Sequence, residues 1–286
     1  MTSRVSSPQS LSTGCELSDG YDTITFLTDF GVTDDFVGIC HGVIRQIAPR
    51  AVVIDLTHGI TPQHVTQGAR RLARALPYLP VGVHLAVVDP GVGGSRRAIA
   101  LRTRQDRIFV GPDNGLLTRA ADTEGIEAAV ELTETRFHLP AVSRTFHARD
   151  IFAPVAAHLA NGADLGDLGG QLDPDTLVRI DDPVARRVGD TIHATVLDCD
   201  RYGNVQINVA YAEIEGFGET VGLAVEGRSF RAVVAPTYSG APKGGLVVLE
   251  ESFGETEIAL NGGSAATDLG VTVGSEIIVR SPLVSG

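Results

Sequence analysis

"VVDPGVGGSRRAI", which runs from Val87 to Ile99, combines two features that a purely structural loop does not need together. It begins as an apolar run typical of a buried strand, breaks at Asp89-Pro90, and continues through three glycines to Arg96 and Arg97. The glycines let the chain turn where other residues would be strained. A carboxylate and two guanidinium groups at the end of a buried strand indicate a functional site rather than a simple turn.

The chain around this loop alternates between strand and helix patterns from about residue 24 to residue 170. Apolar runs at 24–30, 51–60 and 81–89 are separated by stretches with helical spacing, one of which starts after the helix-capping pair Thr61-Pro62. A further helix is predicted over 148–162. Near-continuous apolar strands between helices predict an α/β N-terminal domain with a mostly parallel central sheet, which we place at residues 21–183.

The rest of the chain has a different pattern of apolar residues. Seven short apolar runs with turn signals follow one another, from "TIHATVLD" at 191–198 to "SEIIVR" at 275–280, and almost nothing there has a helical period. This pattern predicts a small all-β C-terminal domain over residues 190–286, either a barrel or a sandwich. Residues 1–20 lack an apolar core and are interpreted as a flexible tail.

Composition and charge exclude several classes of protein. The 286 residues carry 35 acidic and 23 basic side chains, a formal net charge of −12. That charge argues against binding to nucleic acid or to an anionic membrane surface. No apolar run approaches the roughly 18 to 20 residues of a membrane span. Cys15, Cys40 and Cys199 form no CxxC pair, which favours a reducing, cytoplasmic location.

Polar residues gather where the predicted strands end. Ligands of open α/β sheets bind beyond the carboxyl ends of the strands, so these segments are candidates for a site. Two simpler interpretations stay open: Asp113-Asn114 is also a good turn sequence, and Asp34 or Asp35 could cap a helix. The four segments are "TDFGVTDD" (28–35), "DLTHGITP" (55–62), "DPGVGGSRR" (89–97) and "GPDNGLLT" (111–118).

The usual cofactor motifs are absent from the sequence. "GVGGSR" resembles a dinucleotide-binding fingerprint but has Arg96 where that fingerprint ends in glycine, and there is no GxxxxGK[ST] phosphate loop. A metal centre built from Asp29, Asp55, His58 and His64 is conceivable, but these residues lack a recognised ligand spacing. We therefore predict neither a cofactor nor a catalytic metal.

The segment "TFHARD", residues 145–150, places His147 at the start of a predicted helix. The partial positive charge of a helix N-terminus favours a neutral imidazole. Such a histidine is by itself more often structural than catalytic. Together with Asp89 and Arg96, however, it would complete a set that orients and polarises a water molecule without a metal.

Seven motifs, in order, show a family resemblance. From about residue 24 to residue 284 the chain resembles the S-adenosyl-L-methionine (SAM) hydroxide adenosyltransferases, relatives of the 5′-fluoro- and 5′-chloro-adenosine synthases. The resemblance implies an α/β domain, a β-barrel domain, and a homotrimer whose sites lie between the N-terminal domain of one subunit and the C-terminal domain of the next. The motifs are "TDFGVTDDFVG", "DLTHGITP", "VVDPGVGGSRR", "GPDNGLLT", "TFHARDIFAP", "DRYGNVQIN" and "EIALNGGSAA".

The resemblance also assigns roles to residues. The family's water-activating set falls on Asp89, Arg96 and His147, with Arg97 as an adjacent alternative. The related halogenases have no carboxylate at the position of Asp89, and Ala148 stands where the fluorinase has a fluoride-binding serine. This pattern favours water over halide as the nucleophile.

The substrate contacts follow by the same match. Asp29 would hold the ribose hydroxyls and Asn204 would read adenine. Phe146 and Tyr202 would contact the nucleoside, and Gly262 would contact adenine through its backbone. At the methionine end, Asp200 or its competitor Asp198 would take the amino group and Ser252 the carboxylate. Glu251 stands where the family often has asparagine, and Gln63 stands where the fluorinase has an aromatic residue that stacks on the sugar. The implied substrate-binding residues are Asp29, Phe146, Asp200, Tyr202, Asn204, Ser252 and Gly262.

The implied reaction is the metal-independent hydrolysis of SAM to adenosine and L-methionine, with SAM as substrate rather than cofactor. The sulfonium makes methionine a neutral leaving group, so the main task is to hold a water in line with C5′. Asp89 and His147 are expected to accept hydrogen bonds from that water. The alternatives are a halide-using 5′-halo-adenosine synthase and a SAM- or adenosine-binding protein without catalytic activity.

Overall fold

The computed structural model describes residues 20–281, which divide into two compact units between Arg179 and Ile180. The predicted flexible tail, residues 1–20, lies outside the described residues apart from Gly20. Each unit has its own apolar core. None of the helices within residues 20–281 is both long and apolar enough to cross a membrane.

The first unit is built on a seven-stranded sheet that confirms the predicted α/β class. Strands β2, β1, β3 and β5 pair in parallel, whereas β4 is antiparallel to both β5 and β6. β6 therefore runs with the parallel strands and the sheet is mostly parallel. In spatial order the strands are β2 (Val52–Thr57), β1 (Thr23–Thr28), β3 (Val83–Val87), β5 (Ile108–Pro112), β4 (Ala98–Thr103), β6 (Ile126–Glu131) and β7 (Gln171–Leu172).

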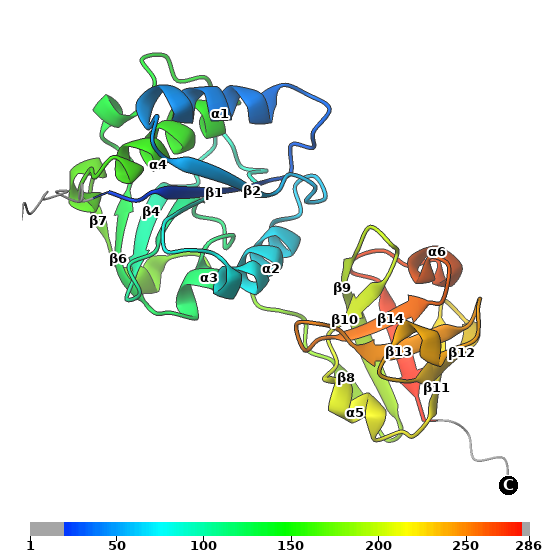
Figure 1. Ribbon diagram of the computed structural model, residues 1–286. Coiled ribbons are helices and arrows are strands. Elements are labelled where there is room, and N and C mark those ends of the chain that lie inside the picture. The colour runs from blue at the N-terminus through cyan, green and yellow to red at the C-terminus, as the bar shows by residue number, and fades with distance from the viewer. Residues whose placement is uncertain (1–19, 282–286) are drawn as a thin grey trace, which may run out of the picture. The chain divides into compact units, whose positions relative to one another are not determined.

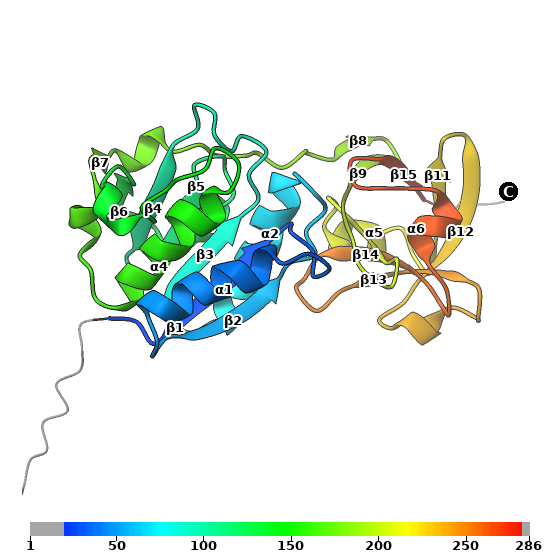
Figure 2. The same ribbon diagram turned by 90° about the horizontal axis from the view of Figure 1, so that it is seen from above.

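Helices cover both faces of this sheet (Figure 1). Helices α1 (Phe36–Ile47) and α4 (Ala153–Ala160) lie side by side on one face (Figure 2), where Phe26 and Ile44 belong to the core. Helices α2 (Val65–Ala75) and α3 (Thr118–Asp122) cover the other face, where Leu27 packs with Leu72. Successive residues of β1 thus enter opposite cores, as the alternation of side chains along a strand requires.

Two predicted helix starts need correction. α2 does not begin at Thr61-Pro62, because Gln63 has a φ of 66°, and the cap is His64, whose ring accepts from the Gln67 backbone N–H at 3.3 Å. The helix predicted over 148–162 is two segments, a wide π-type turn at Ala148–Phe152 followed by α4.

Short 3-10 turns link these elements. They span Leu76–Tyr78, Thr135–Phe137, Leu165–Leu168 and Pro174–Thr176.

The second unit is a seven-stranded barrel, which confirms the predicted β-barrel class. β10 pairs with both β14 and β9, and this double pairing closes the ring. An eighth strand, β8 (Arg186–Val188), pairs with β9 but is not part of the ring. The short helices α5 (Tyr211–Glu215) and α6 (Ala265–Leu269) and a 3-10 turn at Tyr238–Gly240 were not predicted from the sequence. Around the ring the strands are β10 (Val205–Ile207), β14 (Thr256–Leu260), β13 (Leu246–Glu250), β12 (Arg228–Val234), β11 (Thr220–Val225), β15 (Glu276–Arg280) and β9 (Thr191–Cys199).

Candidate active site

Asp89, Arg96 and His147 meet at the carboxyl end of β3. The Arg96 Nε–H donates to both carboxylate oxygens of Asp89 at 3.0 Å, and its Nη2 donates to Asp89 Oδ2 at 2.5 Å. The same Nη2 lies 2.8 Å from His147 Nδ1. The guanidinium stands over the ring of Phe152, with Cζ 5.2 Å from the ring centroid. The structure therefore joins the three predicted groups in one continuous network.

The neighbouring arginine makes a different pair. Arg97 Nε donates to Asp113 Oδ2 at 2.8 Å, and its Nη2 donates to the carbonyl of Thr176 at 2.7 Å. Asp113 also accepts from the backbone N–H of Val178 at 2.9 Å. Of the two adjacent arginines, Arg96 is thus the one that contacts Asp89, and Asp113 serves to hold backbone.

A glycine brings the two halves of this network together. Gly93 has a φ of +72°, and a Cβ built on it would lie 2.2 Å from the carbonyl oxygen of Arg144. The loop that carries Asp89 and Arg96 therefore packs directly on the backbone just before His147, at a distance that only glycine permits. This contact explains one of the glycines in the segment 87–99.

His147 lies at the start of the turn Ala148–Phe152. Burial lowers the pKa of its imidazole, the positive charge of Arg96 lowers it further, and the carboxylates of Asp89 and Asp150 partly oppose the shift. Because an arginine nitrogen only donates, His147 Nδ1 must accept, so the proton of the neutral ring is on Nε2. The ring therefore presents a hydrogen-bond donor at Nε2.

A cavity of about 370 Å³ opens beside the network. Asp29, Asp89, Phe146 and His147 all line it, and Asp29 Oδ2 accepts from the Gln63 backbone N–H at 2.7 Å. Further lining residues are Phe30, Phe36, Pro62, Gln63, Val87, Pro90, Val92, Thr145 and Ala148. The cavity thus combines two carboxylates, an imidazole and aromatic side chains.

The aromatic wall was missed in the sequence. The rings of Phe30 and Phe36 meet Phe146 edge to face, with centroids 6.0 and 5.3 Å apart. Phe30 lies within the polar segment 28–35 and Phe36 directly follows it, and that position was the available signal. Three phenylalanines give this side of the cavity an apolar surface suited to a flat ring.

The barrel carries a second cavity, of about 520 Å³, which four predicted binding residues line: Asp200, Tyr202, Asn204 and Gly262. Asp200 accepts from the backbone N–H groups of Tyr202 and Asn204, each at 2.8 Å, and from Asn204 Nδ2 at 3.0 Å. The amide oxygen of Asn204 is thereby left to act as an acceptor.

Of the residues predicted to bind the methionine end of the substrate, only Asp200 lines this cavity. Asp198 is buried and does not line the cavity, whereas Asp200 does. Ser252 and Glu251 lie in the turn after β13 and do not line it either. Tyr238 does line it and was not predicted; its hydroxyl donates to Glu257 Oε1 at 2.9 Å.

Two segments of the chain match models of a single family. Residues 24–169 match the SAM hydroxide adenosyltransferase N-terminal domain, and residues 194–278 match the SAM hydroxide adenosyltransferase C-terminal domain. The chain belongs to the SAM hydroxide adenosyltransferase family.

Individual relatives agree with this placement. A protein named (R)-S-adenosyl-L-methionine hydrolase from Salinispora arenicola is 48% identical over 90% of this chain and 97% of its own length. A protein of the same name from Salinispora tropica is 49% identical over the same shares. A fluorinase from an Actinoplanes species is more distant, at 28% identity over 92% of this chain and 98% of its own.

A solved structure supports the fold as well. The crystal structure of an uncharacterized conserved protein from Thermotoga maritima is 36% identical and covers 90% of this chain and 99% of its own, with a TM-score of 0.81.

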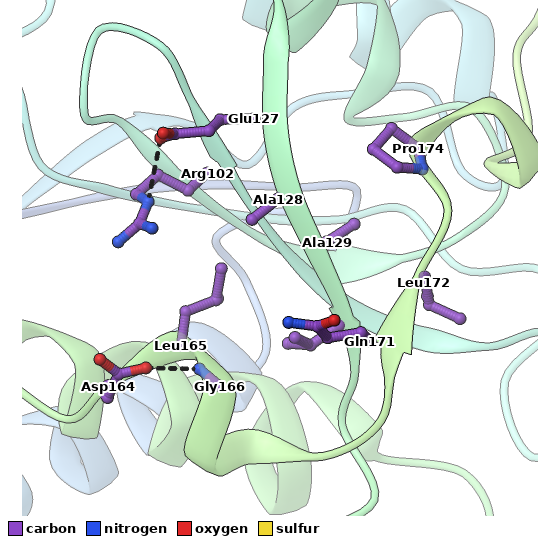
Figure 3. Close-up of a pocket in the computed structure, with 11 residues that line it drawn as sticks. Arg102, Glu127, Ala128, Ala129, Asp164, Leu165, Gly166, Gln171, Leu172 and Pro174 are labelled. Atoms are coloured by element: carbon purple, nitrogen blue, oxygen red, sulfur yellow. Dashed lines mark hydrogen bonds and ion pairs between the residues drawn. The ribbon is translucent and has the colours of Figure 1, made fainter.

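The first unit has another cavity, of about 250 Å³, between β6, β7 and the turn Leu165–Leu168 (Figure 3). Arg102 Nε lies 3.4 Å from Glu127 Oε2, and Asp164 Oδ1 accepts from the Gly166 N–H at 2.7 Å. The cavity contains none of the predicted site residues. We assign it no function.

The conceivable metal ligands do not form one centre. Asp29 lies in the cavity beside the network and His64 caps α2. Asp55 and His58 do come together, and His41, which the sequence did not suggest, joins them, with one possible ligand atom from each within 4.8 Å of the others.

Proposed function

We propose that this enzyme, which acts on SAM, hydrolyses it to adenosine and L-methionine by attack of a water at C5′. The observation that carries the proposal is the Asp89–Arg96–His147 network, whose carboxylate and imidazole line the same cavity as Asp29. The names of the close relatives support the same reaction.

The network suggests a division of labour between its members. Arg96 donates to both oxygens of Asp89 and so fixes the carboxylate in one orientation. Asp89 then acts as the acceptor for a proton of the water. Since His147 carries its proton on Nε2, it donates to the water oxygen rather than accepting from the water. This assignment replaces the expectation that both residues accept.

The reaction is a single displacement. The water oxygen bonds to C5′ as the C5′–S bond breaks, the electron pair leaves with methionine as a neutral thioether, and the surplus proton of the water passes to Asp89. Holding water and substrate in line removes much of the entropic part of the barrier. No step requires a Lewis acid, so we propose that the reaction needs neither a metal nor a cofactor.

We propose the same binding roles that the family resemblance implies. Asp29 holds the ribose hydroxyls and Phe146 contacts the nucleoside in the first unit. In the barrel, Tyr202, Asn204 and Gly262 contact the nucleoside and Asp200 takes the methionine amino group, supported by their shared cavity. We also propose that Ser252 binds the methionine carboxylate, although Ser252 does not line the barrel cavity.

The contacts of one substrate are thus divided between two cavities in two units. We propose a homotrimer in which each active site combines the first unit of one subunit with the barrel of the next. We also propose a cytoplasmic location, supported by the free thiols of Cys40 and Cys199.

Halide transfer is less well supported. An anionic nucleophile would approach the carboxylate of Asp89, which repels it, and Ala148 in the cavity wall has no hydroxyl to hold a halide. A binding protein without turnover would need Asp29 and Asn204 but not the network.

The deciding experiment is incubation with SAM in ¹⁸O-labelled water, with products separated by chromatography and weighed by mass spectrometry. Adenosine labelled in its 5′-hydroxyl is expected, and both sulfonium epimers should be assayed because the relatives' names specify the (R) form. Labelled methionine, or 5′-chloroadenosine in preference to adenosine with chloride present, would contradict the proposal.

The matching variant is Asp89→Ala. Loss of a group that accepts a proton from the nucleophile lowers turnover typically 10²- to 10⁴-fold. The affinity for SAM, measured by calorimetry, should change little because Asp29 and Asn204 remain. Equal losses of rate and affinity would mean that Asp89 holds the substrate instead.

A further inference from the structure

Three side chains between α1 and the end of β2 converge on one point; we call them the α1–β2 cluster: His41, Asp55 and His58. His41 Nε2 lies 2.8 Å from Asp55 Oδ1, and His58 Nε2 lies 3.1 Å from the same oxygen. One possible ligand atom from each of the three lies within 4.8 Å of the others. None of the three lines the cavity beside the Asp89 network.

His58 provides the second, independent observation. His58 is only 6% exposed. Its Nε2 lies close to Asp55 but has no hydrogen-bond partner, because the two groups are poorly aligned for a hydrogen bond. A buried polar atom without a partner calls for an explanation such as an ion. The atom lies close to the same Asp55 oxygen that His41 contacts.

The other nitrogen of His58 is held in place. Nδ1 lies 2.8 Å from Thr28 Oγ1, and the edge of the ring packs against Phe26, with centroids 4.9 Å apart. Metal-binding histidines typically pair their second nitrogen in this way, which fixes the ring and its tautomer. Thr28 and Phe26 therefore present Nε2 of His58 to the cluster.

We propose that His41, Asp55 and His58 bind one divalent transition-metal ion of the Zn²⁺ class. Two imidazole nitrogens and one carboxylate oxygen suit Zn²⁺, whereas Mg²⁺ and Ca²⁺ prefer oxygen ligands throughout. Ligands around tetrahedral zinc lie about 3.3 to 3.6 Å apart, given bonds of about 2.0 to 2.2 Å, so the contacts to Asp55 need to lengthen only a little. The side chains of His41 and Asp55 are 34% and 44% exposed, which leaves a fourth position to water.

The ion would join a helix to the edge of the sheet. His41 belongs to α1, while Asp55 and His58 belong to β2 and the residues after it, and β2 is the last strand on its side. The carbonyl of His58 also accepts from the Gly31 N–H at 2.7 Å, in the loop that carries Asp29. The site is therefore structural: it stabilises α1, β2 and this loop, and it contributes no group to the reaction.

The test begins with protein freed of metal by a chelator and then dialysed. Titration with Zn²⁺ by calorimetry should give one ion per chain, and Co²⁺ should give the visible absorption bands of a tetrahedral site. Mg²⁺ and Ca²⁺ should not compete. The thermal midpoint of the wild-type protein should rise with Zn²⁺ because the ion binds the folded state.

Variants assign the ligands. His41→Ala should weaken Zn²⁺ binding by more than the roughly 10- to 100-fold cost of losing an outer partner of a metal ligand. The matched control is His193→Ala, which removes a partly exposed histidine that pairs with one carboxylate, Glu276, at 2.8 Å. That control should bind Zn²⁺ like the wild type.

Asp55→Asn is the second variant, which keeps the side-chain shape if His41→Ala destabilises the fold. It should also lose the Co²⁺ bands. Failure of the wild-type protein to bind Zn²⁺, or unchanged Zn²⁺ affinity in either cluster variant, would overturn the proposal and leave a hydrogen-bonded His–Asp–His group. These readouts do not involve SAM, so the result is independent of the proposed function.

Discussion

Arg96 and Arg97 occupy neighbouring positions and carry the same charge, yet they pair with different carboxylates. Arg96 fixes Asp89 in the network, whereas Arg97 ties Asp113 to the backbone near Thr176. Arg96→Lys should lower turnover at least about 10²-fold, because a lysine cannot make the forked contact that orients Asp89. Arg97→Lys should keep turnover and lower only the thermal midpoint. Steady-state kinetics and thermal unfolding check both, and equal losses of turnover would contradict the assignment.

The pKa of His147 has a consequence for the pH profile. Burial and the charge of Arg96 lower this pKa below its usual value of 6.5, so the ring stays neutral until the pH falls below that value. We expect kcat/KM to stay level from neutral pH down to about 6.5 and to fall only in more acidic solution. Protonation at Nδ1 would break the contact with Arg96. His147→Gln, which does not titrate, should shift the acid limb, and an unchanged acid limb would show that another group controls it.

At the scale of elements, the packing of one loop on another assembles the network. Gly93→Ala would place a methyl group 2.2 Å from the Arg144 carbonyl and separate Asp89 from His147. Gly227, in the turn between β11 and β12, has a similar φ of +79° but no atom within 4 Å of an added Cβ. Both substitutions strain the backbone by roughly 1–2 kcal/mol, but Gly93→Ala alone should also reduce turnover, by about 10²-fold or more. Full activity in Gly93→Ala would contradict this account.

At the scale of the whole molecule, the proposed trimer allows a complementation test. Asp89→Ala and Asn204→Ala should each be nearly inactive alone. After subunit exchange in an equal mixture, about a quarter of the sites in a cyclic assembly should combine two intact halves and recover activity. Light scattering gives the mass of the assembly. A mixture that stays inactive despite subunit exchange, or a fully active monomer, would contradict the proposal that two subunits form each active site.

A chelator should affect the proposed metal site but not the reaction. Because methionine leaves as a neutral thioether, adenosine formation should survive excess EDTA at moderate temperature. Removing the ion from the α1–β2 cluster should lower the thermal midpoint instead. Loss of turnover with EDTA in both the wild type and His41→Ala, restored by a divalent ion, would show that a metal takes part in the chemistry.

The sequence by itself determined the fold class through local patterns, and its motifs predicted the candidate site residues through a family resemblance. Apolar runs of strand length separated by helical spacing predicted the layered sheet. Seven short runs with turn signals predicted an all-β domain, and the family resemblance favoured a barrel over a sandwich. The motifs around Asp89, His147 and Asn204 placed the candidate groups at strand ends and turns. What the sequence left open was which of two like residues is used, such as Arg96 or Arg97 and Asp198 or Asp200.

Only the tertiary structure shows which of these like residues contacts Asp89 or lines the barrel cavity, because that depends on which atoms meet across long separations in the chain. The contact of Gly93 with Arg144 sets Arg96 beside His147. Because Arg96 can only donate to Nδ1 of His147, the proton of the neutral ring is on Nε2. Phe30 and Phe36 become a cavity wall only when they meet Phe146, and His41 reaches Asp55 only because α1 packs beside β2. Helical and strand periods record which face of an element is buried, but not which side chain on another element it will meet.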